Sequence, residues 1–296
     1  MADVRIGISG WRYPPWRGVF YPAGLPQRDE LAHVAHIFRS VEVNGTFYSL
    51  RRPADYAAWA AQVPADFIFA LKAPRYITHR LRLKEFRTPL ANFLASGLLA
   101  LGPRLGPILW QFPPNFTFDR PRIEAWLAGL PHDTDAAAAL ARLHDAKVAG
   151  RAVVEPASHG PLRHAMEIRH PSFVCAEFVE LLRHYRVALV CADSVEWPRL
   201  MDVTADFVYC RLHGSEQLYA SGYDLPALAA WAGRVLAWAG GAEPADAERA
   251  AGPAPEMAPR DVFVYFDNDA KVRAPADAQA LRRLVIEHAS AGDVTA

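Results

Sequence analysis

The sequence predicts an α/β fold, a single (β/α)8 barrel of the TIM type that covers residues 1–296 and carries two loop insertions. Two observations lead to this prediction. Short β-rich runs alternate with segments of helical periodicity along the chain, and this alternation indicates a mainly parallel sheet covered by helices. Eight such runs occur, and eight strands favour a closed barrel, whose usual length suits this chain.

The predicted strands are short apolar runs rich in β-branched and aromatic residues. In chain order they are Val4–Gly10, Ser40–Asn44, Phe67–Lys72, Pro107–Phe112, Ala165–Arg169, Val187–Asp193, Phe207–His213 and Val262–Asn268. Helical periodicity is present at Asp55–Gln62, Arg122–Leu130, Cys175–Tyr185, Leu225–Ala239 and Ala276–Glu287.

Three connections depart from this regular alternation. Residues 131–163 and 240–260 lack strand signals and exceed common loop lengths, so we expect two insertions. The first contains an Ala-rich segment, Ala136–Ala146, that predicts a helix, whereas the Ala, Pro, Gly and Glu of the second predict a mobile loop. Residues 194–206 are too few for a full barrel helix with two loops, which predicts a shortened helix there.

The composition is that of an ordinary globular protein, with 52% hydrophobic and 22% charged residues. Lys plus Arg equals Asp plus Glu at 32 each, so no global charge attracts nucleic acid or membrane. Cys175, Cys191 and Cys210 lack CxxC spacing and predict reduced thiols. No apolar run of about 18 residues and no signal-peptide pattern occurs, so we expect a soluble, unprocessed, cytoplasmic protein without membrane contact.

Polar side chains recur at the carboxyl ends of the predicted strands. Side chains alternate between the two faces of a strand, so polar residues of one parity project together. In a closed barrel these strand ends meet at one mouth, where barrel enzymes carry their chemistry. For any one polar residue at a strand end, a second explanation is as good as a site: the residue marks the point where the strand leaves the core and meets water. The repetition favours a site, because ionisable groups seldom recur at inward positions without partners or a ligand.

Three of these residues are expected to transfer protons, namely Glu42, Glu167 and His213. The expected substrate-binding residues are Trp11, Asn44, Tyr48, Lys72, Gln111, Arg169, His170, Asp193, Arg211 and Asn268. The cationic members suit a carboxylate or phosphate, and pairing with the carboxylates inside the protein is an equal alternative. His170, which precedes Pro171, and His79 either reach into the mouth or hold their own loops.

Several segments resemble the DUF72 family, also called YecE-like proteins, which are TIM barrels of unassigned activity. The matching segments are 10–13, 16–22, 41–48, 69–73, 78–79, 106–114, 167–173, 211–214 and 265–268. They include Val41-Glu42-Val43-Asn44-Gly45-Thr46-Phe47-Tyr48 and Glu167-Ile168-Arg169-His170-Pro171-Ser172-Phe173. Phe173 stands where the family usually has Trp, and Asp267 stands where a second Asn is common. The resemblance implies the barrel fold and supplies no reaction.

Three functions are consistent with these residues. The first is an enzyme that acts on a small anionic or polyhydroxylated substrate by acid–base catalysis without a cofactor. Its reaction would be that of a hydrolase, a lyase or an isomerase. The second is a metal-dependent phosphodiesterase of the endonuclease IV kind, since carboxylates, His213 and nearby aromatics suit a divalent metal and nucleic acid. We predict no metal site, because HxH and HExxH spacings are absent and three cations would repel the ion. The third is a non-catalytic ligand- or protein-binding barrel.

Overall fold

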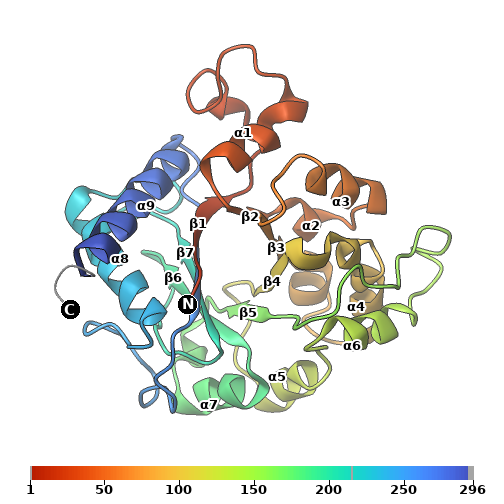
Figure 1. Ribbon diagram of the computed structural model, residues 1–296. Coiled ribbons are helices and arrows are strands. Elements are labelled where there is room, and N and C mark those ends of the chain that lie inside the picture. The colour runs from red at the N-terminus through yellow and green to blue at the C-terminus, as the bar shows by residue number, and fades with distance from the viewer. Residues whose placement is uncertain (1, 215, 293–296) are drawn as a thin grey trace. The chain divides into compact units, whose positions relative to one another are not determined.

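The computed structural model describes residues 2–214 and 216–292, and its eight parallel strands close into a barrel in chain order (Figure 1). The predicted TIM-type fold is therefore confirmed. The strands are β1 (Val4–Ser9), β2 (Ser40–Val43), β3 (Ile68–Lys72), β4 (Leu105–Gln111), β5 (His164–Glu167), β6 (Ala188–Asp193), β7 (Phe207–Leu212) and β8 (Asp261–Phe266). Each overlaps one of the predicted runs.

Helices fill most of the connections between strands. The α-helices are α1 (Glu30–Ile37), α2 (Gly45–Tyr48), α3 (Pro53–Ala60), α4 (Arg87–Leu94), α5 (Arg120–Leu127), α6 (Thr134–Ala141), α7 (Ala176–Tyr185), α8 (Leu225–Ala239) and α9 (Arg273–Gly292). The short turns are η1 (Pro14–Trp16), η2 (Gln27–Asp29), the π-helix η3 (Tyr76–Arg80), η4 (Leu98–Arg104) and η5 (Pro171–Phe173). The sequence analysis did not predict α1, α2 and α4.

Aspartate caps define where three of these helices begin. The side chains of Asp119, Asp133 and Asp224 accept hydrogen bonds from the backbone N–H groups three residues later, at 3.2, 2.7 and 2.9 Å. Such a bond satisfies one of the N–H groups that the first helical turn leaves without a partner. The caps begin α5, α6 and α8 respectively.

The chain divides into two compact units. The central unit is Leu31–Phe173 and contains β2 to β5, and the terminal unit is Met1–Glu30 with Val174–Ala296 and contains β1 and β6 to β8. In the central unit, the buried Trp110 of β4 packs against Trp126 of α5 with ring centroids 5.3 Å apart. In the terminal unit, α8 packs against α9, and both contact β8.

The two insertions and the short connection differ in their structure. The first insertion contains α6, which confirms a helix in the Ala-rich region, although it begins and ends earlier than predicted. Residues 194–206 form neither helix nor strand. The second insertion, which the sequence predicted to be mobile, makes several polar contacts with the rest of its unit. Glu248 pairs with Arg199, and Asp246 pairs with Arg234. The Asp202 carboxylate accepts hydrogen bonds from the N–H groups of residues 250 and 251.

His164 in β5 is a buried histidine with two structural hydrogen bonds. The indole Nε1–H of Trp110 donates to His164 Nδ1 at 3.0 Å, so Nε2 carries the proton and donates to the carbonyl of Pro131 at 2.7 Å. The side chain is completely buried, and burial lowers the pKa of His164 from 6.5 to about 4. The neutral ring is therefore the form that the fold requires.

We expect this histidine to destabilise the protein in acid. Below pH 6.5 the unfolded chain binds a proton that the folded ring takes up only near pH 4, so stability falls across this range. The shift corresponds to roughly 3 kcal/mol. A His164→Gln variant keeps an acceptor and a donor but does not titrate. Urea unfolding at neutral pH and at pH 4 should show a smaller loss in the variant than in the parent, and equal losses would contradict this role.

Candidate functional site

Four polar side chains of the central unit lie on one face of neighbouring strands. The parallel register pairs Glu42 with Ala70, Lys72 with Leu109, and Gln111 with Glu167. Paired residues of neighbouring strands project to the same side, and residues two apart on one strand do so as well. Glu42, Lys72, Gln111 and Glu167 therefore share a face, as the sequence predicted.

This shared face is the one that turns away from the helices. Phe69 and Trp110, which have the opposite parity, contact Trp59 of α3 and Trp126 of α5. Glu42 and Glu167 are 0% exposed, Gln111 is 6% exposed and Lys72 is 7% exposed. Two carboxylates and an ammonium group are thus held out of bulk water at the carboxyl ends of β2, β3 and β5, where each charge has a strong effect on its neighbours.

Glu167 and Arg169 form a buried ion pair at the end of β5. The Arg169 Nε–H donates to Glu167 Oε1 at 2.7 Å, and the side chains are 9% and 0% exposed. Arginine is the side chain best suited to bind a carboxylate or phosphate, and the pairing with Glu167 fixes the orientation of this one. The sequence left two roles open for Arg169, binding a ligand or pairing with a carboxylate of the protein. The pairing with Glu167 is present, and it does not conflict with ligand binding.

His79 is a site residue that the sequence analysis considered and left out of its predicted set. It lies in the π-helix η3, an irregular turn often found at functional sites. Its ring is 5.1 Å from the Phe47 ring, and Lys72 Nζ lies 4.5 Å from the same ring. Burial, followed by the positive charges of Lys72 and Arg169, lowers the pKa of His79 from 6.5 to about 4. The imidazole is therefore neutral at pH 7.

The α2 turn positions Phe47 beside Lys72. The buried hydroxyl of Thr46 lies 2.7 Å from the backbone carbonyl of Lys72, which joins the start of α2 to the end of β3. Asn44 directly precedes α2 and is half-buried. Tyr48, predicted to line the pocket, is 69% exposed and contacts Phe47 with ring centroids 5.1 Å apart.

His170 shows the local role that the sequence offered as its alternative. Its Nδ1 shares a hydrogen bond of 2.8 Å with the Ser172 hydroxyl and accepts one from the Ser172 N–H at 3.1 Å. The hydroxyl of Ser172 also accepts a hydrogen bond from the N–H of Phe118 at 2.8 Å. His170 therefore orders the loop that follows β5.

A second charged cluster lies in the terminal unit at the ends of β7 and β8. Arg211 Nη2 donates to Asp267 Oδ2 at 2.7 Å, and His213 Nδ1 lies 3.2 Å from the same oxygen. The side chains of Arg211 and His213 are 0% exposed. His213 also meets the rings of Trp197 and Tyr219 edge to face. Asp267, which the sequence marked only as a family departure, is thus the counter-ion of Arg211.

Asp193 and Asn268, two of the predicted substrate-binding residues, contact helices of the terminal unit. Arg211 pairs with Ala192, so Asp193, the next residue, lies on the other face of β6. Asn268 lies beyond the last residue of β8, Phe266. Both turn toward helices. The Asp193 carboxylate accepts hydrogen bonds from Trp231 of α8 at 3.2 Å and from Arg199 at 3.1 Å.

Asn268 and Trp11 also have structural contacts in the terminal unit. Asn268 Nδ2 donates to the Asp277 carboxylate of α9 at 2.8 Å and to the carbonyl of Ser221 at 3.0 Å. These bonds join the end of β8 to α9 and to the loop before α8. Trp11 is 6% exposed, and its carbonyl accepts a hydrogen bond from the Tyr21 hydroxyl.

The described part of the chain lacks two features, a metal-binding cluster and a membrane-spanning helix. Within residues 2–214 and 216–292, no group of three or more His, Cys, Asp or Glu side chains is arranged to hold a metal ion. Over the same residues, no helix has both the length and the apolar character that a membrane span needs.

The fold and the buried charges define a TIM-type barrel with polar side chains at the carboxyl ends of its strands. Residues 5–295 match the family described as "Protein of unknown function DUF72", and the chain belongs to this family. The resemblance seen in the sequence is therefore confirmed. The family description assigns no activity.

Curated relatives and solved structures agree with this membership. The chain is 27% identical over 171 residues to the UPF0759 protein YecE of Escherichia coli (strain K12), and this match covers 57% of the chain and 50% of the relative. It is 27% identical over 124 residues to the UPF0759 protein YunF of Bacillus subtilis (strain 168), and this match covers 38% of the chain and 41% of the relative. The matches thus span half or less of these curated relatives.

The similar solved structures support the fold. A DUF72 family protein (TM1631) from Thermotoga maritima MSB8 has a TM-score of 0.71 at 24% identity, with 96% of this chain and 99% of that chain covered. A DUF72 family protein (EF0366) from Enterococcus faecalis V583 has a TM-score of 0.67 at 17% identity, with 95% of each chain covered.

Proposed function

We propose that this protein is an enzyme that acts on a small anionic or polyhydroxylated substrate by acid–base chemistry at the carboxyl ends of β2 to β5. The observation that carries the proposal is the set formed by the Glu167–Arg169 ion pair, the ammonium of Lys72 and the neutral ring of His79. These groups combine fixed positive charge with proton-transferring side chains, which is the combination that acid–base catalysis on an anion requires.

Each side chain has a distinct role in this proposal. Arg169 and Lys72 bind the anionic part of the substrate and stabilise charge that develops on it. Glu167 and Glu42 are the carboxylates that transfer protons, and Gln111 orients the substrate through its amide. In the terminal unit, His213 beside Asp267 remains a proposed proton-transfer group.

His79 adds a proton acceptor whose basicity depends on the ligand. The charges of Lys72 and Arg169 contribute to its low pKa of about 4. An anion bound to these two side chains offsets their charge and so raises the pKa of His79, although burial, the largest cause of the shift, continues to lower it. A histidine with a pKa near the working pH is an efficient general base. The bound substrate thus activates the base.

This coupling predicts that anion binding is accompanied by proton uptake. At a pH slightly above 4, where the ring of the free protein is mostly neutral, each bound anion should be accompanied by the uptake of a fraction of one proton. Calorimetry in buffers of different ionisation enthalpy measures this uptake. Affinity should rise as the pH falls toward this range, because the protonated ring adds a positive charge. A His79→Gln variant should lose the uptake, and an affinity without pH dependence in the parent would contradict the coupling.

A substrate screen tests the proposed function itself. Purified protein is incubated with phosphorylated sugars, nucleosides and carboxylates, and both turnover and thermal shift are measured. Turnover of one compound class that Arg169→Met abolishes would support the proposal. The absence of turnover and of any thermal shift across all three classes would overturn it.

A further inference from the structure

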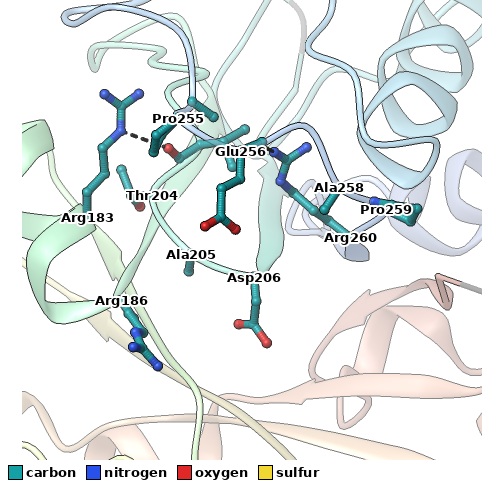
Figure 2. A pocket seen from close by; sticks show the side chains of 12 residues that line it. Arg183, Arg186, Thr204, Ala205, Asp206, Pro255, Glu256, Ala258, Pro259 and Arg260 are labelled. Atoms are coloured by element: carbon teal, nitrogen blue, oxygen red, sulfur yellow. Dashed lines mark hydrogen bonds between the residues drawn. The ribbon is translucent and has the colours of Figure 1, made fainter.

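The terminal unit contains a cavity of about 500 Å³ at the amino ends of β7 and β8 (Figure 2). Its walls are the end of α7 with Arg183 and Arg186, the residues from Val203 to Asp206 before β7, and the residues from Ala254 to Arg260 before β8. The volume lies in the range of small-molecule sites. The cavity is at the opposite end of β7 and β8 from Arg211 and Asp267.

Arg260 brings a buried positive charge to this cavity. The residue is 4% exposed, and its guanidinium donates hydrogen bonds to the backbone carbonyls of Gly241, at 3.0 Å, and Glu256. Among the described residues no carboxylate lies within ion-pair distance of it. Burial lowers the pKa of Arg260, and the more distant charges of Glu243 and Glu256 oppose this effect. A buried cation with only carbonyl partners is costly, so an anion in the cavity would be stabilising.

The wall that contains Arg260 is held in place by charged side chains. Glu243 pairs with Arg249 and accepts a hydrogen bond from the N–H of Ala254 at 3.0 Å. Arg183 donates to the carbonyl of Gly252 at 2.7 Å and to that of Val203 at 3.2 Å, so it joins two walls of the cavity. A cavity that is already formed loses less entropy when it binds a ligand than a loose loop does.

The charges that line the cavity favour an anion. Three arginines, Arg183, Arg186 and Arg260, and two carboxylates, Asp206 and Glu256, line the cavity. Arg183 is paired with Glu180, whereas the guanidinium of Arg260 donates to backbone carbonyls. Arg186 is exposed at the end of α7, and it lines the cavity together with Asp206 and Glu256 (Figure 2). Carboxylates beside an arginine suit a ligand whose anionic group is accompanied by hydroxyl or amino donors.

We propose that this cavity is a second binding site, independent of the proposed catalytic site, for a small phosphate- or carboxylate-bearing molecule. Arg260 binds the anionic group within the cavity, and Arg186 contacts it at the rim. Glu256 and Asp206 accept hydrogen bonds from the hydroxyl or amino groups of the same ligand.

Calorimetric titration with ribose 5-phosphate, inorganic phosphate and citrate tests this site. We expect saturable binding of at least one probe with one site per chain. Arg260→Met should weaken it by about tenfold or more, because a charge-assisted hydrogen bond is lost. Ala258→Trp, at an exposed position of the wall, should block the cavity. Arg28→Gln, which alters a highly exposed arginine of the same unit, is the matched control and should bind as the parent does.

The outcomes separate this site from the proposed catalytic one. Glu167→Gln should leave the binding unchanged, since Glu167 belongs to the central unit. If Arg260→Met fails to fold by circular dichroism, the exposed Arg186→Gln variant and Ala258→Trp decide the question. The proposal is overturned if none of the probes binds at millimolar concentration, or if Ala258→Trp binds them as tightly as the parent.

Discussion

An Asp267→Asn variant is expected to lose about 3–5 kcal/mol of unfolding free energy, because it removes a carboxylate that pairs with a buried charge. The guanidinium of Arg211 is 0% exposed and donates to Asp267 at 2.7 Å. The guanidinium also donates to the Ser9 hydroxyl at 3.3 Å, and this neutral group does not compensate the charge as a carboxylate does. Urea unfolding at neutral pH measures the loss.

A pair of control variants makes this prediction specific. Asp66→Asn removes the partner of Arg39 in a pair whose side chains are 53% and 59% exposed, and such surface pairs contribute about 0–1 kcal/mol. The double variant Arg211→Met with Asp267→Asn should be more stable than Asp267→Asn alone, since it removes the buried charge as well. If Asp267→Asn costs no more than Asp66→Asn, the ion pair does not have the structural role described above.

A Glu167→Gln variant is expected to lose about 100- to 10,000-fold in kcat/KM on a substrate found by the screen, the usual contribution of a proton-transferring group. Glutamine keeps an oxygen that accepts the hydrogen bond from Arg169, so substrate binding should change less than turnover. Glu155→Gln, in an exposed pair with Arg142 of the same unit, is the matched control and should leave kcat/KM unchanged.

The pH profile separates a chemical role of Glu167 from a structural one. If Glu167 transfers the proton, the variant should lose one limb of the kcat/KM profile, whereas a purely structural role would lower the whole profile without changing its shape. A parent-like rate in Glu167→Gln would exclude the carboxylate from proton transfer and leave Glu42 as the candidate of this unit.

The order of elements could be predicted from the sequence because it depends on local patterns. Apolar runs such as Phe207–His213 and helical periodicity such as Leu225–Ala239 contain enough information to locate β7 and α8 within a residue or two. Helices with weaker signals were missed. One of them, α4, contains Asn92 and Pro89 and begins without a side-chain cap, so its sequence resembles a loop.

Residues of the candidate site could be predicted only in part. Alternation correctly grouped Glu42, Lys72, Gln111 and Glu167, because all four lie within regular strands or at their last residue. It did not identify His79, whose position depends on the π-helix η3 and on packing against Phe47.

The sequence by itself determined the barrel and the presence of charged groups at the strand ends, because strand parity and helical periodicity are local properties of the chain. The tertiary structure decided which of those groups are partners. Asp267 and Asn268 are adjacent polar residues after one strand, and only their contacts with distant segments show that Asp267 pairs with Arg211 whereas Asn268 donates to Asp277. That choice depends on pairing between distant segments, which no local pattern contains.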